Sequence, residues 1–186
     1  MPMNNTNLRA RLVLVAGATG LAGNAVLQQL LVLFPRARLR GTWRTVPPYL
    51  QDPRIEYVRA DLTRQEDCLR VANGCDAAIL AAAVTGGARS AQSEPHRQVT
   101  DNLVMDALLF EALHQSGVRR AVYLSTATVY QDSNGCLRED ELDWNLDPPL
   151  VYFGVGWAKR AAEKLCRFWH ARHGMQILIA RCANLY

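Results

Sequence analysis

The chain has 186 residues, of which 49% are hydrophobic and 20% are charged, a composition typical of a single soluble globular domain. No apolar run reaches the roughly 20 residues of a membrane span, and the polar N-terminus lacks the apolar segment of a secretory signal. These features predict a cytoplasmic protein without a membrane partner. The five cysteines show no metal-ligand spacing, so we expect free thiols, buried or partly buried, and no metal site.

The net charge of +4 is unevenly distributed along the chain. Residues 1–60 contain eight arginines and two acidic residues, whereas residues 61–186 carry a net charge of −2. The arginines are not interleaved with aromatic residues that could stack on bases, which argues against a nucleic-acid partner. A small molecule that carries phosphate groups explains the same bias.

Apolar, strand-like runs alternate with helical patterns along the chain. Strands are expected at residues 11–17, 37–43, 55–60, 76–83, 120–126 and 175–181. Helices are expected at residues 20–34, about 63–73, 97–116 and about 156–172. Thr63 is expected to cap the second helix, with Glu66 at the spacing of a capping box, and Gly117 to end the third. The acidic, turn-rich residues 131–150 predict a surface loop. This alternation predicts an α/β fold, a doubly wound parallel Rossmann sheet in a single domain.

A glycine-rich loop joins the first strand to the first helix. It contains Gly17, Thr19, Gly20, Leu21 and Gly23. Glycines at this spacing allow a tight turn, close approach of the backbone to a pyrophosphate, and close packing of the helix on the strand. The helix N-terminus adds N–H donors and the positive end of its dipole. The loop therefore predicts a dinucleotide-binding site.

The end of the second strand indicates which dinucleotide is bound. An NAD site usually has an acidic residue there, which holds the ribose 2′-hydroxyl. This chain has Thr42, Trp43 and Arg44 instead. Arg44 can pair with a 2′-phosphate, which favours NADP over NAD as the cofactor. If Arg44 has no role in binding, it is an ordinary solvated arginine of a loop. Asp61 could accept a hydrogen bond from the adenine amino group, serve as an acid at the start of the next helix, or do both.

The sequence resembles the extended short-chain dehydrogenase/reductases, the family of sugar-nucleotide epimerases, dehydratases and reductases. The resemblance rests on GATGLAG at 17–23, ADL at 60–62, AAA at 81–83, Asn102, LSTATVY at 124–130, AK at 158–159 and the final RCANLY. AAAVTGGA and LSTATVYQ are most similar to GDP-fucose synthases. The resemblance implies an NAD(P) cofactor and a nucleotide-sugar substrate, and it allows a homodimer. It also implies a smaller C-terminal lobe, which this sequence lacks, either as a fragment or as a natural cofactor-binding remnant.

The resemblance also implies roles for individual residues around the cofactor. The loop glycines would cradle the pyrophosphate. Asp61 and Leu62 would flank the adenine, and Ala81, Ala82 and Ala83 would pass under the cofactor.

The implied catalytic residues depart from the family pattern at one position. Thr126 matches the Ser or Thr that hydrogen-bonds the reacting sugar oxygen, and Lys159 matches the lysine that holds the nicotinamide ribose. The family tyrosine should lie four residues before the lysine, on the same helix face, where this chain has Val155. Tyr152 could replace it only if the backbone near Gly154 bends, and is otherwise a surface or packing aromatic.

Two functions follow from these features, and they leave open whether the chain is an enzyme. The first is an NADP(H)-dependent oxidoreductase or epimerase of a nucleotide-activated sugar, represented by its cofactor-binding domain. The second is a non-catalytic NADP-binding protein, a cofactor sensor or partner subunit that has lost the catalytic tyrosine.

Overall fold

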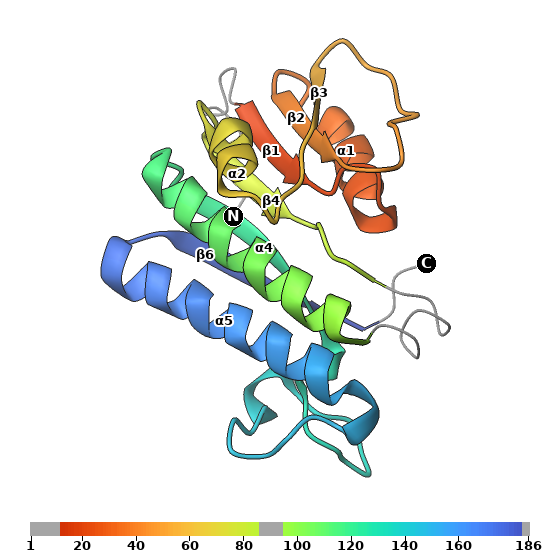
Figure 1. The fold of residues 1–186 in the computed structure, drawn as a ribbon. Coiled ribbons are helices and arrows are strands. Elements are labelled where there is room, and N and C mark those ends of the chain that lie inside the picture. The colour runs from red at the N-terminus through yellow and green to blue at the C-terminus, as the bar shows by residue number, and fades with distance from the viewer. Residues whose placement is uncertain (1–11, 86–94, 184–186) are drawn as a thin grey trace, which may run out of the picture.

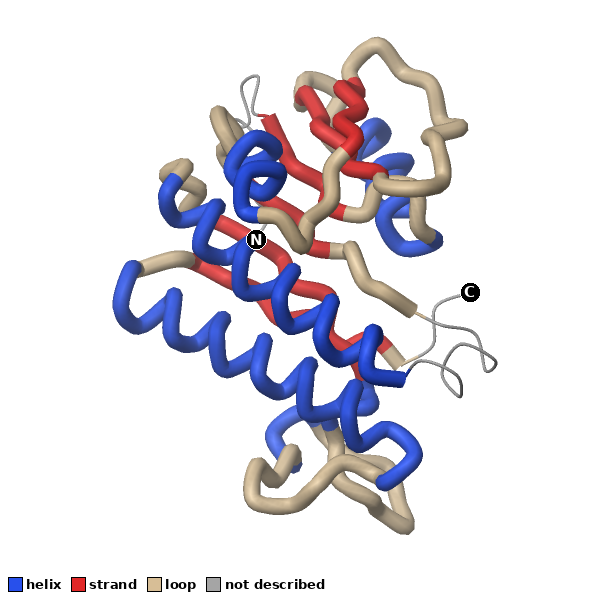
Figure 2. The backbone as a smooth tube through the Cα atoms, in the orientation of Figure 1, coloured by secondary structure: helices blue, strands red, loops and turns tan. Residues whose placement is uncertain are grey.

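The computed structural model describes residues 12–85 and 95–183, which form a parallel six-stranded sheet with helices on both faces (Figures 1 and 2). The strands are β1 (Leu12–Ala16), β2 (Arg38–Trp43), β3 (Ile55–Arg59), β4 (Ala77–Leu80), β5 (Arg120–Thr126) and β6 (Gln176–Cys182). Their order in the sheet is β3-β2-β1-β4-β5-β6. The predicted doubly wound Rossmann arrangement is therefore confirmed.

The helices divide between the two faces of the sheet (Figure 1). Helix α1 (Leu21–Leu33) lies on one face, and α2 (Gln65–Ala72), α4 (Pro95–Gln115) and α5 (Phe153–His173) lie on the other. The connection after β1 crosses the face covered by α1, whereas the connections after β3 and β4 cross the opposite face. The loops that follow the neighbouring strands β1 and β4 therefore lead away from each other. Ligands of such sheets bind at this switch point, beyond the carboxyl ends of the strands.

The central position of β1 in the sheet explains why its sequence is a continuous apolar run. Val13 and Val15 pack in the core under α1, whereas Leu14 and Ala16 pack in the core under α2, α4 and α5. A strand that is buried on both faces has no solvent side and reads as a continuous apolar run.

The starts of three helices differ from the prediction, and α4 begins at Pro95, two residues before its predicted start. Helix α2 begins at Gln65 with Arg64 at its N-cap, so Thr63 does not cap it. The Thr63 hydroxyl instead donates a hydrogen bond of 2.8 Å to the Asp61 carboxylate. Helix α5 begins at Phe153, three residues earlier than predicted, directly after a 3₁₀ turn at Leu150–Tyr152.

Other local predictions have mixed outcomes. Gly117 follows α4 with a φ of 76°, as its predicted place at the end of that helix requires. Cys68, Cys75 and Cys166 are buried thiols, but Cys136 is exposed because it lies in the surface loop at 131–150. The sequence features at 1–11, 86–88 and 184–186 lie outside the described residues.

None of the helices within residues 12–85 and 95–183 has the length and hydropathy of a membrane span. The same ranges contain no group of three or more His, Cys, Asp or Glu side chains that could hold a metal ion.

Candidate functional site

The three glycines of the first loop have different surroundings. Gly17 has a φ of 78°, and a Cβ there would lie 2.6 Å from the Cα of Ala82. A Cβ on Gly23 would lie 2.1 Å from the carbonyl oxygen of Gly17. Both glycines are therefore required by the packing of the chain itself. A Cβ on exposed Gly20 would meet only the Gly17 oxygen, at 3.4 Å, so the space above Gly20 is open to a ligand.

Helix α1 begins at this open space. Gly20 is its N-cap residue, with no side-chain hydrogen bond to the helix, and the first turn contains no acidic residue. The first N–H groups of the helix are thus left for water or a ligand. An anion placed there would also gain from the helix dipole.

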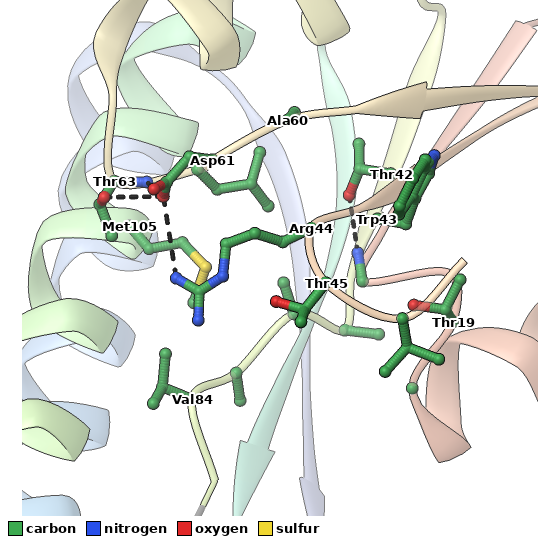
Figure 3. Close-up of a pocket in the computed structure, with 17 residues that line it drawn as sticks. Thr19, Thr42, Trp43, Arg44, Thr45, Ala60, Asp61, Thr63, Val84 and Met105 are labelled. Atoms are coloured by element: carbon green, nitrogen blue, oxygen red, sulfur yellow. Dashed lines mark hydrogen bonds and ion pairs between the residues drawn. The ribbon is translucent and has the colours of Figure 1, made fainter. Parts of the chain in front are cut away.

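A first cavity, of about 260 Å³, lies at the carboxyl ends of β1, β2 and β3 (Figure 3). Arg44 extends across it from the end of β2 toward Asp61, with 3.8 Å between Nη1 and Oδ1. The two side chains are 47% and 39% exposed, so a ligand can reach both. The Thr63 hydroxyl and N–H lower the pKa of Asp61, and the charge of Arg44 adds to this effect. Asp61 is therefore a carboxylate at neutral pH, able to accept hydrogen bonds.

The first cavity also contains a contact that the sequence did not indicate. The Thr42 hydroxyl accepts a hydrogen bond of 2.9 Å from the Gly17 N–H. This contact ties the glycine loop to the end of β2 and fixes the conformation of the loop. A buried threonine at a strand end carries no sequence signal that separates it from an ordinary core residue.

A second cavity, of about 430 Å³, lies between the carboxyl end of β5 and the helices α4 and α5. Thr126, Val155 and Lys159 all line it. The prediction that residues 155 and 159 share one helix face is therefore correct. Tyr152 is not among the lining residues; it ends the 3₁₀ turn before α5 and is 49% exposed.

The two cavities adjoin at the switch point of the sheet. Both are lined by Gly20 and by Ala81, Ala82, Ala83 and Val84, which follow β4. An elongated ligand could therefore extend from Arg44 to Lys159 across the chain that leaves β4.

Asn102 holds that chain in place. Its Oδ1 accepts from the Val84 N–H at 2.8 Å, and its Nδ2 donates to the Val84 carbonyl at 3.0 Å. The sequence singled out Asn102 only as part of the family motif, and this paired contact with the backbone supplies a structural reason for a buried amide at this position.

Lys159 contacts two groups of β5. Its Nζ donates to the Tyr123 hydroxyl at 2.8 Å and to the Leu124 carbonyl at 3.3 Å. The Tyr123 hydroxyl in turn donates to Asp106 at 2.6 Å. Burial raises the pKa of Asp106. The charge of Lys159 and the hydrogen bond from the Tyr123 hydroxyl act in the opposite direction but do not cancel this effect. Burial, followed by the nearby Asp106, raises the pKa of Tyr123, so Tyr123 is a neutral hydroxyl and not an available acid.

Glu163, one turn after Lys159, belongs to a separate buried network. It accepts from Ser125 at 2.6 Å and pairs with both Nε and Nη2 of Arg181, at 3.0 and 2.9 Å. Arg181 also donates to the Tyr130 hydroxyl at 3.0 Å. Tyr130 is thus occupied in a structural contact.

Most of the predicted site residues line one cavity or both, and two do not. The exceptions are Gly23, which is needed for packing, and Tyr152. The lining residues are Gly17, Thr19, Gly20, Leu21, Arg44, Asp61, Leu62, Ala81, Ala82, Ala83, Thr126 and Lys159.

Comparison with protein families gives one match over nearly the whole chain. The model of the NAD dependent epimerase/dehydratase family matches residues 13–186. The chain belongs to this family. The predicted resemblance is thereby confirmed at the level of the family.

The curated relatives of the chain include nucleotide-sugar enzymes. GDP-mannose 3,5-epimerase 1 of Oryza sativa subsp. japonica is 30% identical over 136 residues, which cover 70% of this chain. GDP-L-fucose synthase of Sinorhizobium fredii is 30% identical over 132 residues, which cover 69% of this chain. The matched regions span only 35% and 41% of those two proteins.

Solved structures share the fold. A GDP-mannoheptose C4 reductase of Campylobacter jejuni with NADP bound has a TM-score of 0.78 at 19% identity, over 95% of this chain and 52% of that one. A UDP-glucuronic acid 4-epimerase of Bacillus cereus, in complex with UDP-glucuronic acid and NAD, has a TM-score of 0.74 at 25% identity. That match covers 91% of this chain and 55% of the epimerase.

Proposed function

We propose that the chain is the NAD(P)-binding domain of an epimerase, dehydratase or reductase that acts on a nucleotide-activated sugar. The observation that carries the proposal is the pair of adjoining cavities, which meet over open Gly20 at the switch point of the sheet. A dinucleotide is an elongated ligand with two anionic groups at its centre, and helix N-termini at this position bind such groups. The nucleotide-sugar names of the curated relatives support the choice of substrate class.

We infer that residues of this chain would contact the cofactor along its length. The open space at Gly20 and the first N–H groups of α1 would hold the pyrophosphate. Asp61 and Leu62 would flank the adenine, and Lys159 would donate to the nicotinamide ribose. When bound, the cofactor supplies hydride transfer at its nicotinamide. Thr126 would hydrogen-bond and orient the reacting oxygen of the sugar.

We further propose that the cofactor is NADP. Arg44 lies in the cavity at the end of β2, where an acidic residue would repel a 2′-phosphate and an arginine attracts it. The guanidinium faces Asp61 at 3.8 Å, a distance longer than a close hydrogen bond, and it is half-exposed. Arg44 can therefore turn toward a phosphate without breaking a tight buried contact.

Replacing Arg44 with alanine should lower the affinity for NADPH by about 10- to 100-fold, the usual worth of a charge-assisted hydrogen bond. The affinity for NADH should change little, because NADH has no 2′-phosphate. Titration calorimetry with both cofactors measures the two effects. Arg64→Ala is the matched control, since it removes a nearby exposed arginine that does not line the cavity. Equal affinities of the wild-type chain for NADPH and NADH would contradict the assignment of Arg44.

Val155 favours a second candidate, a non-catalytic NADP-binding protein. This residue lies on the cavity wall with Lys159, at the position that the family resemblance assigns to the catalytic tyrosine. Valine can neither donate nor accept a proton, and Tyr152 does not line the same cavity. Both candidates require the same cofactor site and differ in whether turnover follows. A cytoplasmic location and a homodimer stay predictions from the sequence.

A further inference from the structure

Asp106 is a buried carboxylate that the proposed function does not use. It lies in the middle of α4, and its side chain is only 4% exposed. A carboxylate is costly to bury unless it is hydrogen-bonded and paired with a positive charge. Asp106 meets both conditions through two side chains on other elements, Tyr123 on β5 and Lys159 on α5.

The three groups form a directed chain of hydrogen bonds. The Lys159 ammonium donates to the Tyr123 hydroxyl at 2.8 Å, and that hydroxyl donates to Asp106 Oδ2 at 2.6 Å. The Lys159 nitrogen also lies 3.9 Å from Asp106 Oδ2. A hydroxyl can donate and accept at once, so Tyr123 satisfies both neighbours and fixes their separation.

The other carboxylate near Lys159 is already matched. Glu163 lies one helical turn further along α5, but Arg181 pairs with it through two nitrogens and Ser125 donates to it. The thiol of Cys166, also on α5, has its pKa raised by burial and is neutral at physiological pH. Among the described residues that pack around Lys159, Asp106 is thus the carboxylate available to balance its charge.

The arrangement leaves one ammonium hydrogen free for the cavity. An ammonium has three donors, and the Tyr123 hydroxyl and the Leu124 carbonyl take two of them. Lys159 nevertheless lines the second cavity beside Thr126 and Val155. The third donor can therefore serve a ligand while the other two hold the nitrogen against β5.

We infer that Asp106 is a positioning residue, which acts through Tyr123 to hold the Lys159 ammonium against β5 and to balance its charge. The inference rests on the proposed function in that the ribose of NAD(P) is the ligand that the held lysine would meet. Asp106 itself does not line either cavity and would touch neither cofactor nor substrate.

A measurement without cofactor tests the link directly, because the chain has only two lysines, Lys159 and Lys164. Labelling the lysine side chains with ¹³C at Cε gives two NMR signals, and Lys164→Arg assigns them. Asp106→Asn keeps the shape of the side chain and removes its charge. We expect it to change the chemical shift of the Lys159 signal, because the ammonium loses the charge that lies 3.9 Å from it. Glu111→Gln removes a carboxylate near the far end of the same helix and should leave the signal unchanged.

NADPH titration of the same proteins tests the consequence for the ligand. Asp106→Asn should bind NADPH about tenfold more weakly than wild type, because its lysine is no longer held against β5 for the ligand. If Asp106→Asn does not fold, Asp106→Ser removes the same charge and leaves a hydroxyl to accept from Tyr123. An unchanged Lys159 signal in a folded variant would overturn the positioning role. Failure of the wild-type chain to bind any NAD(P)H would instead overturn the proposed function, and the NMR result would stand apart from it.

Discussion

Replacing Gly20 with valine is expected to abolish the binding of NADPH while the domain stays folded. The backbone at Gly20 has a φ of −76°, which any residue can adopt, and a Cβ there meets only one protein atom at 3.4 Å. The two methyl groups would instead occupy the space that we assign to the pyrophosphate. We expect the affinity for NADPH to fall by more than about 100-fold, or roughly 2.7 kcal/mol of binding free energy.

A valine at Gly17 is the comparison that separates an effect on cofactor binding from an effect on folding. Valine at Gly17 would need a left-handed backbone conformation and would collide with Ala82. Gly17→Val should therefore lose its folded circular dichroism spectrum, whereas Gly20→Val should keep it and lose only the calorimetric signal of NADPH. A folded Gly20→Val protein that binds NADPH normally would mean that the loop is a turn without a role in binding.

The second large effect is expected from Val155→Tyr, made in a chain extended by the remaining part of the Sinorhizobium fredii GDP-L-fucose synthase. Residue 155 lies one helical turn before Lys159 and lines the same cavity, which has room for a larger side chain. A phenol there would supply the proton-transferring group that valine lacks. General acid–base catalysis contributes about 10²- to 10⁴-fold to a rate, so turnover of a nucleotide sugar should rise by about that factor over the extended Val155 protein.

Tyr152→Phe in the Val155 background is the control for this change. Tyr152 ends the 3₁₀ turn before α5, is half-exposed and lies outside the cavity lining. Removing its hydroxyl should leave any residual turnover unchanged. A loss of measurable turnover in Tyr152→Phe would make Tyr152 the working acid and would remove the reason to treat Val155 as a loss.

The order of elements and the sheet could be predicted from the sequence because buried parallel strands carry a strong signal. The run at β1 is apolar throughout since both of its faces are covered, and the glycine loop after it marks the first turn from strand to helix. The shared face of Val155 and Lys159 was equally predictable, because residues four apart on a helix lie one above the other.

The starts of α2 and α5 and the contacts between residues distant in the sequence could not be predicted. Thr63 has the sequence signature of a helix cap, but the nearby Asp61 carboxylate takes its hydroxyl and N–H. Helix α5 starts early because the 3₁₀ turn at Leu150–Tyr152 leads directly into it, although these apolar residues are exposed. Asp106 resembles any polar residue of a helix surface in sequence, and only the approach of β5 and α5 shows that it is buried.

A crystal structure of the chain grown with NADPH would show whether the cofactor occupies the two adjoining cavities. We expect one cofactor across the carboxyl ends of the strands, with its pyrophosphate over Gly20, its 2′-phosphate against Arg44 and its nicotinamide ribose on Lys159. We also expect Val155, and no phenol, beside the nicotinamide. A structure in which NADPH lies elsewhere, or in which Gly20 and Lys159 make no contact with it, would contradict the account.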